Sequence, residues 1–86
     1  MNELVLNAEK IHTTLMGAER IKRNLRLPEV DVDGVVEFCK DKIKDGRSRF
    51  YRRGKNWYVE IEDIIITVNA RAFTVITAHG GNRPGE

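Results

Sequence analysis

The segment from Trp57 to His79 constrains the fold more than any other part of the chain, because it contains three consecutive strands with a predictable register. Two-residue turns at Glu62-Asp63 and Ala70-Arg71 bring alternate residues of all three strands to one sheet face. This face is almost wholly apolar and consists of Trp57, Val59, Ile61, Ile64, Ile66, Val68, Phe73, Val75 and Thr77. A slip by one residue would scatter the apolar set over both faces, so the alternation supports this register.

A fourth strand is predicted immediately before this segment. Residues 47–53 form the strand and Gly54-Lys55 forms its turn, since glycine at the first central position suits a type II′ hairpin. On the face away from the apolar set, the register pairs Arg49, Tyr51 and Arg53 with Glu60, Tyr58 and Asn56. The four strands therefore form an antiparallel meander.

Two amphipathic helices are predicted on the N-terminal side of the sheet. Apolar residues recur at steps of three and four from Leu4 to Leu25, which predicts one continuous helix that the following proline ends. A second helix begins after Asp31 or Asp33 and ends at Asp45-Gly46. The helices have to cover the apolar sheet face. The sequence thus predicts an α+β fold with two N-terminal helices packed on one face of a four-stranded antiparallel β-meander.

The composition favours one soluble domain. The folded part is expected over residues 1–79 of the 86, and a flexible C-terminal tail over residues 80–86. The single cysteine, Cys39, cannot form an internal disulfide, which favours a reducing cytoplasm. No apolar run is long enough for a membrane span, so no membrane partner is expected. Neither metal-ligand spacing nor a phosphate-binding glycine loop is present, so no metal or cofactor is predicted.

The distribution of charge points to a phosphate-bearing partner. The net charge is only +2, but basic residues concentrate in residues 20–26 and 47–55. Opposite the apolar stripe, the first predicted helix carries a second stripe of Thr13, Gly17, Arg20 and Asn24. This stripe is either a solvated helix face or a place where glycine lets another backbone or a ligand come close.

The open face, meaning the sheet face away from the helices, is the first candidate binding surface. One cross-strand row on it consists of Tyr51, Tyr58, Thr67 and Thr74, flanked by Arg49 and Arg53. Aromatic rings beside guanidinium groups offer a stacking surface for a base and positive charge for a phosphate. Ile65 and Ile76 on the same face favour a different interpretation, an interface with a partner protein or with a second copy.

A second candidate site lies where two hairpin turns meet at one end of the sheet. It consists of Arg53, Lys55, Asn56, Asn69 and Arg71. His79 falls at the opposite end, roughly 13–17 Å away at about 3.3 Å per strand residue. A general acid–base pair would therefore combine His12 with His79, or His12 with the basic residues.

Three segments resemble a family of small bacterial and phage proteins classed as a domain of unknown function: HTTLMGAERIKRNL, RRGKNWYVEI and ITVNARAFTVITAH. More loosely, helices followed by a four-stranded sheet that ends in T-x-I-T-A-H resemble the barnase, EndoU, colicin and RelE group of metal-independent ribonuclease toxins. That resemblance implies RNA cleavage on the open face. It nominates as catalytic residues His12, Arg20, Thr67, Thr74 and His79.

These features support three hypotheses of different classes. The leading one is a small cytoplasmic domain that binds RNA or a nucleotide-like ligand, with metal-independent RNA cleavage as the activity that the resemblance implies. The alternative is a non-catalytic phage or mobile-element effector that sequesters a nucleotide signal or inhibits a host defence protein. The third is a homodimeric interaction module that uses the open face as its interface.

Overall fold

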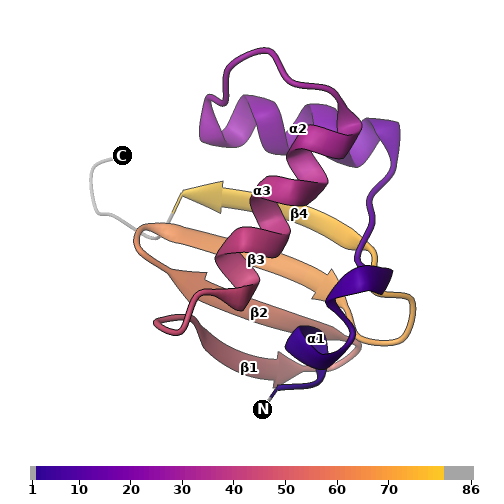
Figure 1. Ribbon diagram of the computed structural model, residues 1–86, viewed down its shortest axis with the longest axis vertical. Helices are drawn as coiled ribbons and strands as arrows, with labels where there is room; N and C mark the ends of the chain where they lie inside the picture. The colour runs from indigo at the N-terminus through magenta and orange to yellow at the C-terminus, as the bar shows by residue number, and fades with distance from the viewer. Residues whose placement is uncertain (1, 81–86) are drawn as a thin grey trace.

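The computed structural model describes residues 2–80, which fold into helices followed by a four-stranded sheet (Figure 1). The elements are α1 (Glu3–Leu6), a 3-10 helix (Ala8–Lys10), α2 (Leu15–Leu25), α3 (Val32–Lys44), β1 (Arg49–Arg53), β2 (Asn56–Ile61), β3 (Ile64–Asn69) and β4 (Val75–Gly80). The sheet is antiparallel with the order β1-β2-β3-β4, so the predicted α+β fold and meander are confirmed. Gly80 ends β4, and the rest of the expected tail lies outside the described residues.

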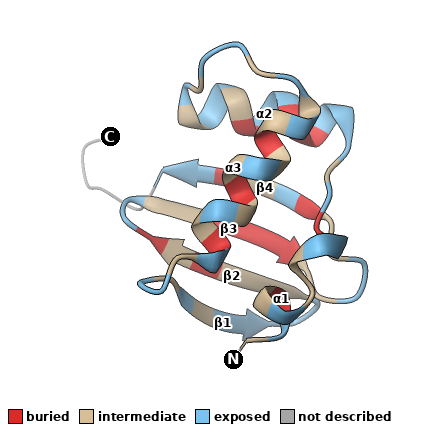
Figure 2. Ribbon diagram, viewed as in Figure 1, coloured by how far each residue is buried: buried red, intermediate tan, exposed pale blue. Residues whose placement is uncertain are grey.

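Helix α3 crosses the sheet (Figure 1) and contributes three residues to the buried core. Asp31 caps its N-terminus by accepting a hydrogen bond from Gly34 N at 2.8 Å. Val35, Cys39 and Ile43 follow at four-residue steps, so they share one stripe, and all three are fully buried. Figure 2 shows this buried stripe facing the buried residues of the central strands. Within residues 2–80, no helix is long and apolar enough to cross a membrane.

The predicted register of the first three strands is confirmed. Tyr51 lies opposite Tyr58, and Val59 lies opposite Ile66. Gly54 has a φ of 60°, which a glycine in the first central position of this turn adopts without steric cost. The pairing begins at Arg49 rather than at residue 47, because residues 45–48 form the exit from α3.

The predicted continuous helix from Leu4 to Leu25 is wrong. The chain leaves the helical conformation after Lys10, and His12 forms a parallel bridge with Thr74, just before β4: His12 N donates to Phe73 O at 3.1 Å and His12 O accepts from Val75 N at 2.7 Å. Helix α2 then begins after Thr14, whose hydroxyl accepts from the backbone nitrogen of the third helical residue at 2.9 Å. Tertiary pairing with a strand has overridden an apolar periodicity that a single helix would also satisfy.

The predicted register between β3 and β4 is also wrong. Thr67 lies opposite Thr77 and Val68 opposite Val75, so Ile76 is an extra residue in a β-bulge. The two-residue turn at Ala70-Arg71 is replaced by a longer loop over residues 70–74, in which Phe73 has a φ of 61°. A left-handed phenylalanine is rare, and the sequence pattern does not signal it.

Three residues of the predicted stripe, Thr13, Gly17 and Asn24, have a structural role at the outer edge of β4, whereas the fourth, Arg20, lies on the exposed surface of α2. Thr13 Oγ1 donates to Val75 O at 2.8 Å, and Asn24 Nδ2 donates to Ala78 O at 3.3 Å. A Cβ atom at Gly17 would lie 2.5 Å from Thr13 Oγ1 and 3.5 Å from Val75 O. Glycine therefore permits the close approach of another backbone, and polar groups of β4 that would otherwise face solvent are covered.

An ion-pair network supports the turn between β2 and β3, at the end of the sheet opposite the β1–β2 turn. Glu62, the first turn residue, has a φ of 56°. Its carboxylate accepts from Lys42 Nζ at 2.7 Å and from Arg47 Nη2 at 3.3 Å, and Arg47 also binds both carboxylate oxygens of Asp45. The Arg47 hydrogen bonds lower the pKa of Asp45 to about 2, and the Lys42 hydrogen bond lowers the pKa of Glu62.

We expect Gly17→Ala to destabilise the protein. Overpacking costs about 1–3 kcal/mol, and the gain in helix propensity from alanine is only about 1 kcal/mol. Urea unfolding should show a net loss on the order of 1 kcal/mol. Gly46→Ala is the matched control, because nothing lies within 4 Å of its Cβ position. A Gly17→Ala variant more stable than the wild type would contradict the tight contact with Thr13.

We expect stability to fall at acidic pH. Asp45 and Glu62 bind protons more weakly in the folded chain than in the unfolded one, so their contribution is present above their unfolded pKa values of 3.8 and 4.5. The contribution of Asp45 is lost as the pH falls toward about 2, and that of Glu62 is lost as the pH falls through its lowered pKa. Urea unfolding at about pH 6 and about pH 3 measures the loss, which Asp45→Asn with Glu62→Gln should reduce. If the double variant loses as much stability at acidic pH as the wild type, Asp45 and Glu62 are not the cause of the pH dependence.

Candidate functional site

The candidate site is a pocket of about 330 Å³ at the end of the sheet where the β1–β2 and β3–β4 connections meet. This turn-end pocket is lined by Arg52, Lys55, Asn69 and Arg71. Its volume is at the lower end of the range for small-molecule sites, which is about 300–1,000 Å³. Three of the four lining side chains are cationic, so the pocket suits an anion.

Backbone and side-chain hydrogen bonds fix the two connections relative to each other. Ala70 N donates to Lys55 O at 2.8 Å, which joins the loops directly. Asn69 Oδ1 accepts from Arg71 N at 3.0 Å and from Ala72 N at 2.8 Å, so the side chain shapes its own turn, as Asn commonly does. The pocket therefore has a preformed wall.

The cations of the turn-end pocket are available to a ligand. Among residues 2–80, the ion pairs use Lys22, Lys40, Lys42 and Arg47, and none uses a residue that lines the pocket. Arg52 is oriented without a carboxylate: its Nε donates to Gly54 O at 2.9 Å, and its guanidinium lies 5.7 Å from the centre of the Trp57 ring. An anion in the pocket would therefore not compete with an internal carboxylate among residues 2–80.

Arg52 is the pocket residue that sequence reasoning missed, and Arg53 was expected in its place. Arg53 lies opposite Asn56 on the open face, whereas Arg52 lies opposite Trp57 on the helix side and lines the pocket. The signal was available, because Arg52 occupies an apolar-face position two residues after Phe50. A charge there indicates that the apolar core stops before the end of the sheet.

The open face keeps most of its predicted row. Tyr51 and Tyr58 stack with ring centroids 5.5 Å apart and planes inclined by 14°. Tyr51 Oη donates to Glu60 at 3.3 Å, and desolvation followed by the Glu60 charge raises the pKa of this hydroxyl. Thr67 is next in the row and is only 7% exposed. The fourth member is Thr77, so the placement of Thr74 in this row was wrong.

Thr74 lies instead beside His12 at the same end of the sheet as the turn-end pocket. Thr74 Oγ1 and His12 Nε2 are 3.0 Å apart, and His12 Nδ1 is 2.9 Å from Lys10 O. A carbonyl can only accept, so Nδ1 carries a proton, and in the neutral ring Nε2 accepts from the Thr74 hydroxyl. The structure thus brings together two of the five nominated catalytic residues in a hydroxyl–imidazole–carbonyl arrangement.

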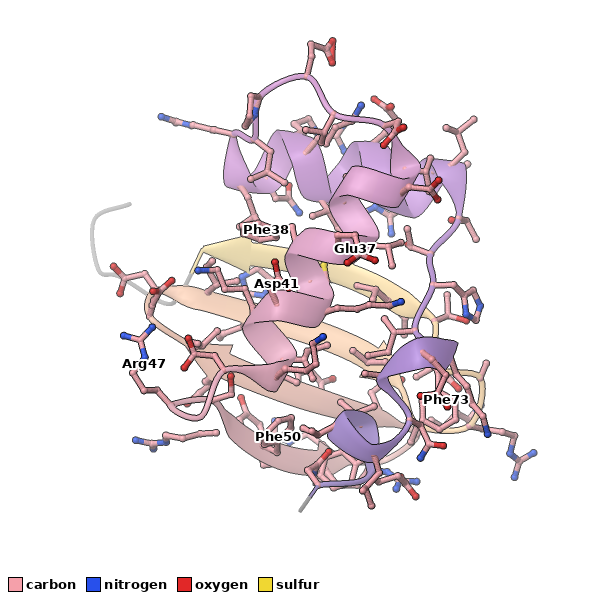
Figure 3. The ribbon with its side chains drawn as sticks, in the orientation of Figure 1. Glu37, Phe38, Asp41, Arg47, Phe50 and Phe73 are labelled. Carbon is pink, nitrogen blue, oxygen red and sulfur yellow. The ribbon has the colours of Figure 1, made fainter. Side chains whose placement is uncertain are left out.

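The other three nominated residues do not join this pair. His79 lies opposite Ile65, toward the other end of the sheet, and its Nδ1 contacts Gly80 O at 2.8 Å. Arg20 lies on the exposed surface of α2, and Thr67 lies within the open face. Figure 3 shows how far apart the two ends are: Phe73 lies beside the N-terminal segment, and Arg47 lies at the opposite end. A mechanism that uses both histidines on one substrate atom is incompatible with this arrangement.

A family model described as "Protein of unknown function (DUF3781)" matches residues 5–79. The chain belongs to this family. No curated protein and no solved structure gives a significant match. The comparisons therefore confirm the family resemblance, and none of them supports the resemblance to ribonuclease toxins. Within the described residues of this family member, no group of three or more His, Cys, Asp or Glu side chains could hold a metal ion.

We expect Asn69 to be required for the shape of the turn-end pocket. Asn69→Ala removes two hydrogen bonds to backbone nitrogens, at about 0.5–1.5 kcal/mol each, so urea unfolding should show a loss of about 1–2 kcal/mol. Asn69→Asp retains the acceptor oxygen, so its free energy of unfolding should fall much less. Equal losses in the two variants would contradict the capping role of Oδ1.

Proposed function

We propose that the protein binds RNA or a nucleotide through the turn-end pocket. The observation that carries the proposal is the convergence of Arg52, Lys55 and Arg71 on one pocket without a carboxylate partner among residues 2–80. Guanidinium and ammonium groups bind phosphate oxygens through charge-assisted hydrogen bonds. A phosphate is therefore the ligand group that this lining favours.

The open face supplies the second part of the proposed site. The stacked Tyr51–Tyr58 pair lies two residues from the β1–β2 turn on the same strands, which is about 7 Å at the rise of a β-strand. Tyr51 is 37% exposed, so a base can stack on its outer surface. Arg49 and Arg53 flank the pair and add positive charge along the path of a phosphate backbone.

The hydrogen bond between Thr74 and His12 favours a second candidate function, metal-independent RNA cleavage. The oriented imidazole of His12 is a proton acceptor, and its partner Thr74 lies in the loop that also carries Arg71. A ribose 2′-hydroxyl in place of the Thr74 hydroxyl would meet the same nitrogen. The effector hypothesis uses the same pocket differently, because sequestering a nucleotide requires binding without turnover.

Calorimetric titration with a 5′-phosphorylated, mixed-sequence RNA octamer tests binding. We expect Lys55→Ala or Arg71→Ala to raise Kd about tenfold or more, because each removes a charge-assisted hydrogen bond. Lys44→Ala, an exposed cation at the C-terminus of α3, is the control and should leave Kd unchanged. Tyr51→Ala should weaken binding of the octamer but not of inorganic phosphate, which offers nothing to stack. An octamer that binds neither the wild type nor the variants removes the proposal.

Incubation with total RNA and transfer RNA in the presence of a chelator tests cleavage. If His12 is the proton acceptor, His12→Ala should abolish cleavage, whereas His79→Ala should retain it because His79 lies at the other end of the sheet. Thr74→Val, which keeps the side-chain shape and removes the hydroxyl, separates an effect of this hydrogen bond from a loss of folding. If the wild-type protein leaves the RNA undegraded, the hypothesis of an enzyme is wrong, and the binding proposal is unaffected.

A further inference from the structure

The charge in the turn-end pocket exceeds that of a single phosphodiester. Arg52, Lys55 and Arg71 bring three positive charges to one pocket. An internal phosphodiester carries one negative charge, whereas a terminal phosphate carries about 1.5 to 2 at pH 7 and presents three strong acceptor oxygens. Building on the proposed function, we infer that the pocket selects the terminal phosphomonoester of a nucleotide or of an RNA end.

The hydrogen-bonding groups of the lining match such an end. Oδ1 of Asn69 is used by the backbone nitrogens of its own turn, so its amide nitrogen remains as a donor. Nε of Arg52 is used by Gly54 O, so its two terminal nitrogens remain. Lys55 and Arg71 have only donors in their side chains. The lining thus offers several donors to a group that has only acceptors.

The surroundings of the pocket favour one direction for the rest of the ligand. On the helix side, the indole N–H of Trp57 donates to the carboxylate of Glu3 at 3.1 Å, and this negative charge disfavours a second phosphate. On the open face, the stacked Tyr51–Tyr58 pair lies about two strand residues, or roughly 7 Å, from the turn. A strand that ends in the pocket can therefore continue over the tyrosines, on the sheet face away from Glu3.

Three RNA hexamers of one sequence test this inference by calorimetric titration. One carries a 5′-phosphate, one carries a 3′-phosphate, and one has hydroxyl groups at both ends. We expect at least one phosphorylated hexamer to bind about tenfold or more tightly than the hydroxyl form, and the tighter of the two identifies the end that is bound. Inorganic phosphate should compete with the phosphorylated hexamer.

The outcomes separate this inference from the proposed function. Equal affinity for all three hexamers overturns the selection of a terminal phosphate and leaves RNA binding intact, whereas binding of none of them overturns both. Asn69→Asp retains the turn acceptor and introduces a negative charge into the lining, so it should abolish the preference for a phosphorylated end. Lys44→Ala should keep the preference. A preference that persists in Asn69→Asp would place the terminal phosphate outside this pocket and overturn the inference.

Discussion

The bridge between His12 and Thr74, at the entrance to β4, is the contact on which the arrangement of the N-terminal half depends. Two backbone hydrogen bonds, His12 N to Phe73 O and Val75 N to His12 O, hold this part of the chain extended. The extended conformation sets where α2 begins, and it places Thr13 and Gly17 against the outer edge of β4. The same contact holds the loop that carries Arg71 beside the N-terminal segment. The position of α2 and the position of the loop at the candidate site therefore depend on the same two hydrogen bonds of His12.

The first three strands could be predicted from sequence because their turns are short and one sheet face is apolar. Each two-residue turn leaves a single register that puts the apolar residues together, and the structure has that register. The fourth strand could not be predicted this way. Its register depends on a left-handed Phe73 and a bulge at Ile76, which Lys10 above the Phe73 ring and the His12 pairing support from outside the hairpin. Alternation within the strand carries no information about these contacts.

The candidate site was predicted only in part, because some of its residues lie in turns between neighbouring strands and others depend on long-range contacts. Lys55, Asn69 and Arg71 belong to turns whose meeting at one end follows from an antiparallel meander, so their clustering was predictable. The neighbourhood of His12 was not, because it depends on a segment that the apolar periodicity assigns to a helix. Periodicity reports which residues share a side, but it cannot separate a continuous helix from a helix that starts after an extended segment.

The pairing within the sheet is local in sequence, whereas the contact that covers the β4 edge is long-range. Each strand pairs with its immediate neighbour in the chain, whereas the contact of Thr13 with Val75 spans 62 residues. During synthesis the residues of α2 are made long before those of β4, and their hydrogen-bonding partners do not yet exist. The N-terminal segment can therefore reach its native position only after β4 has been made, so its docking against β4 is a late step in folding.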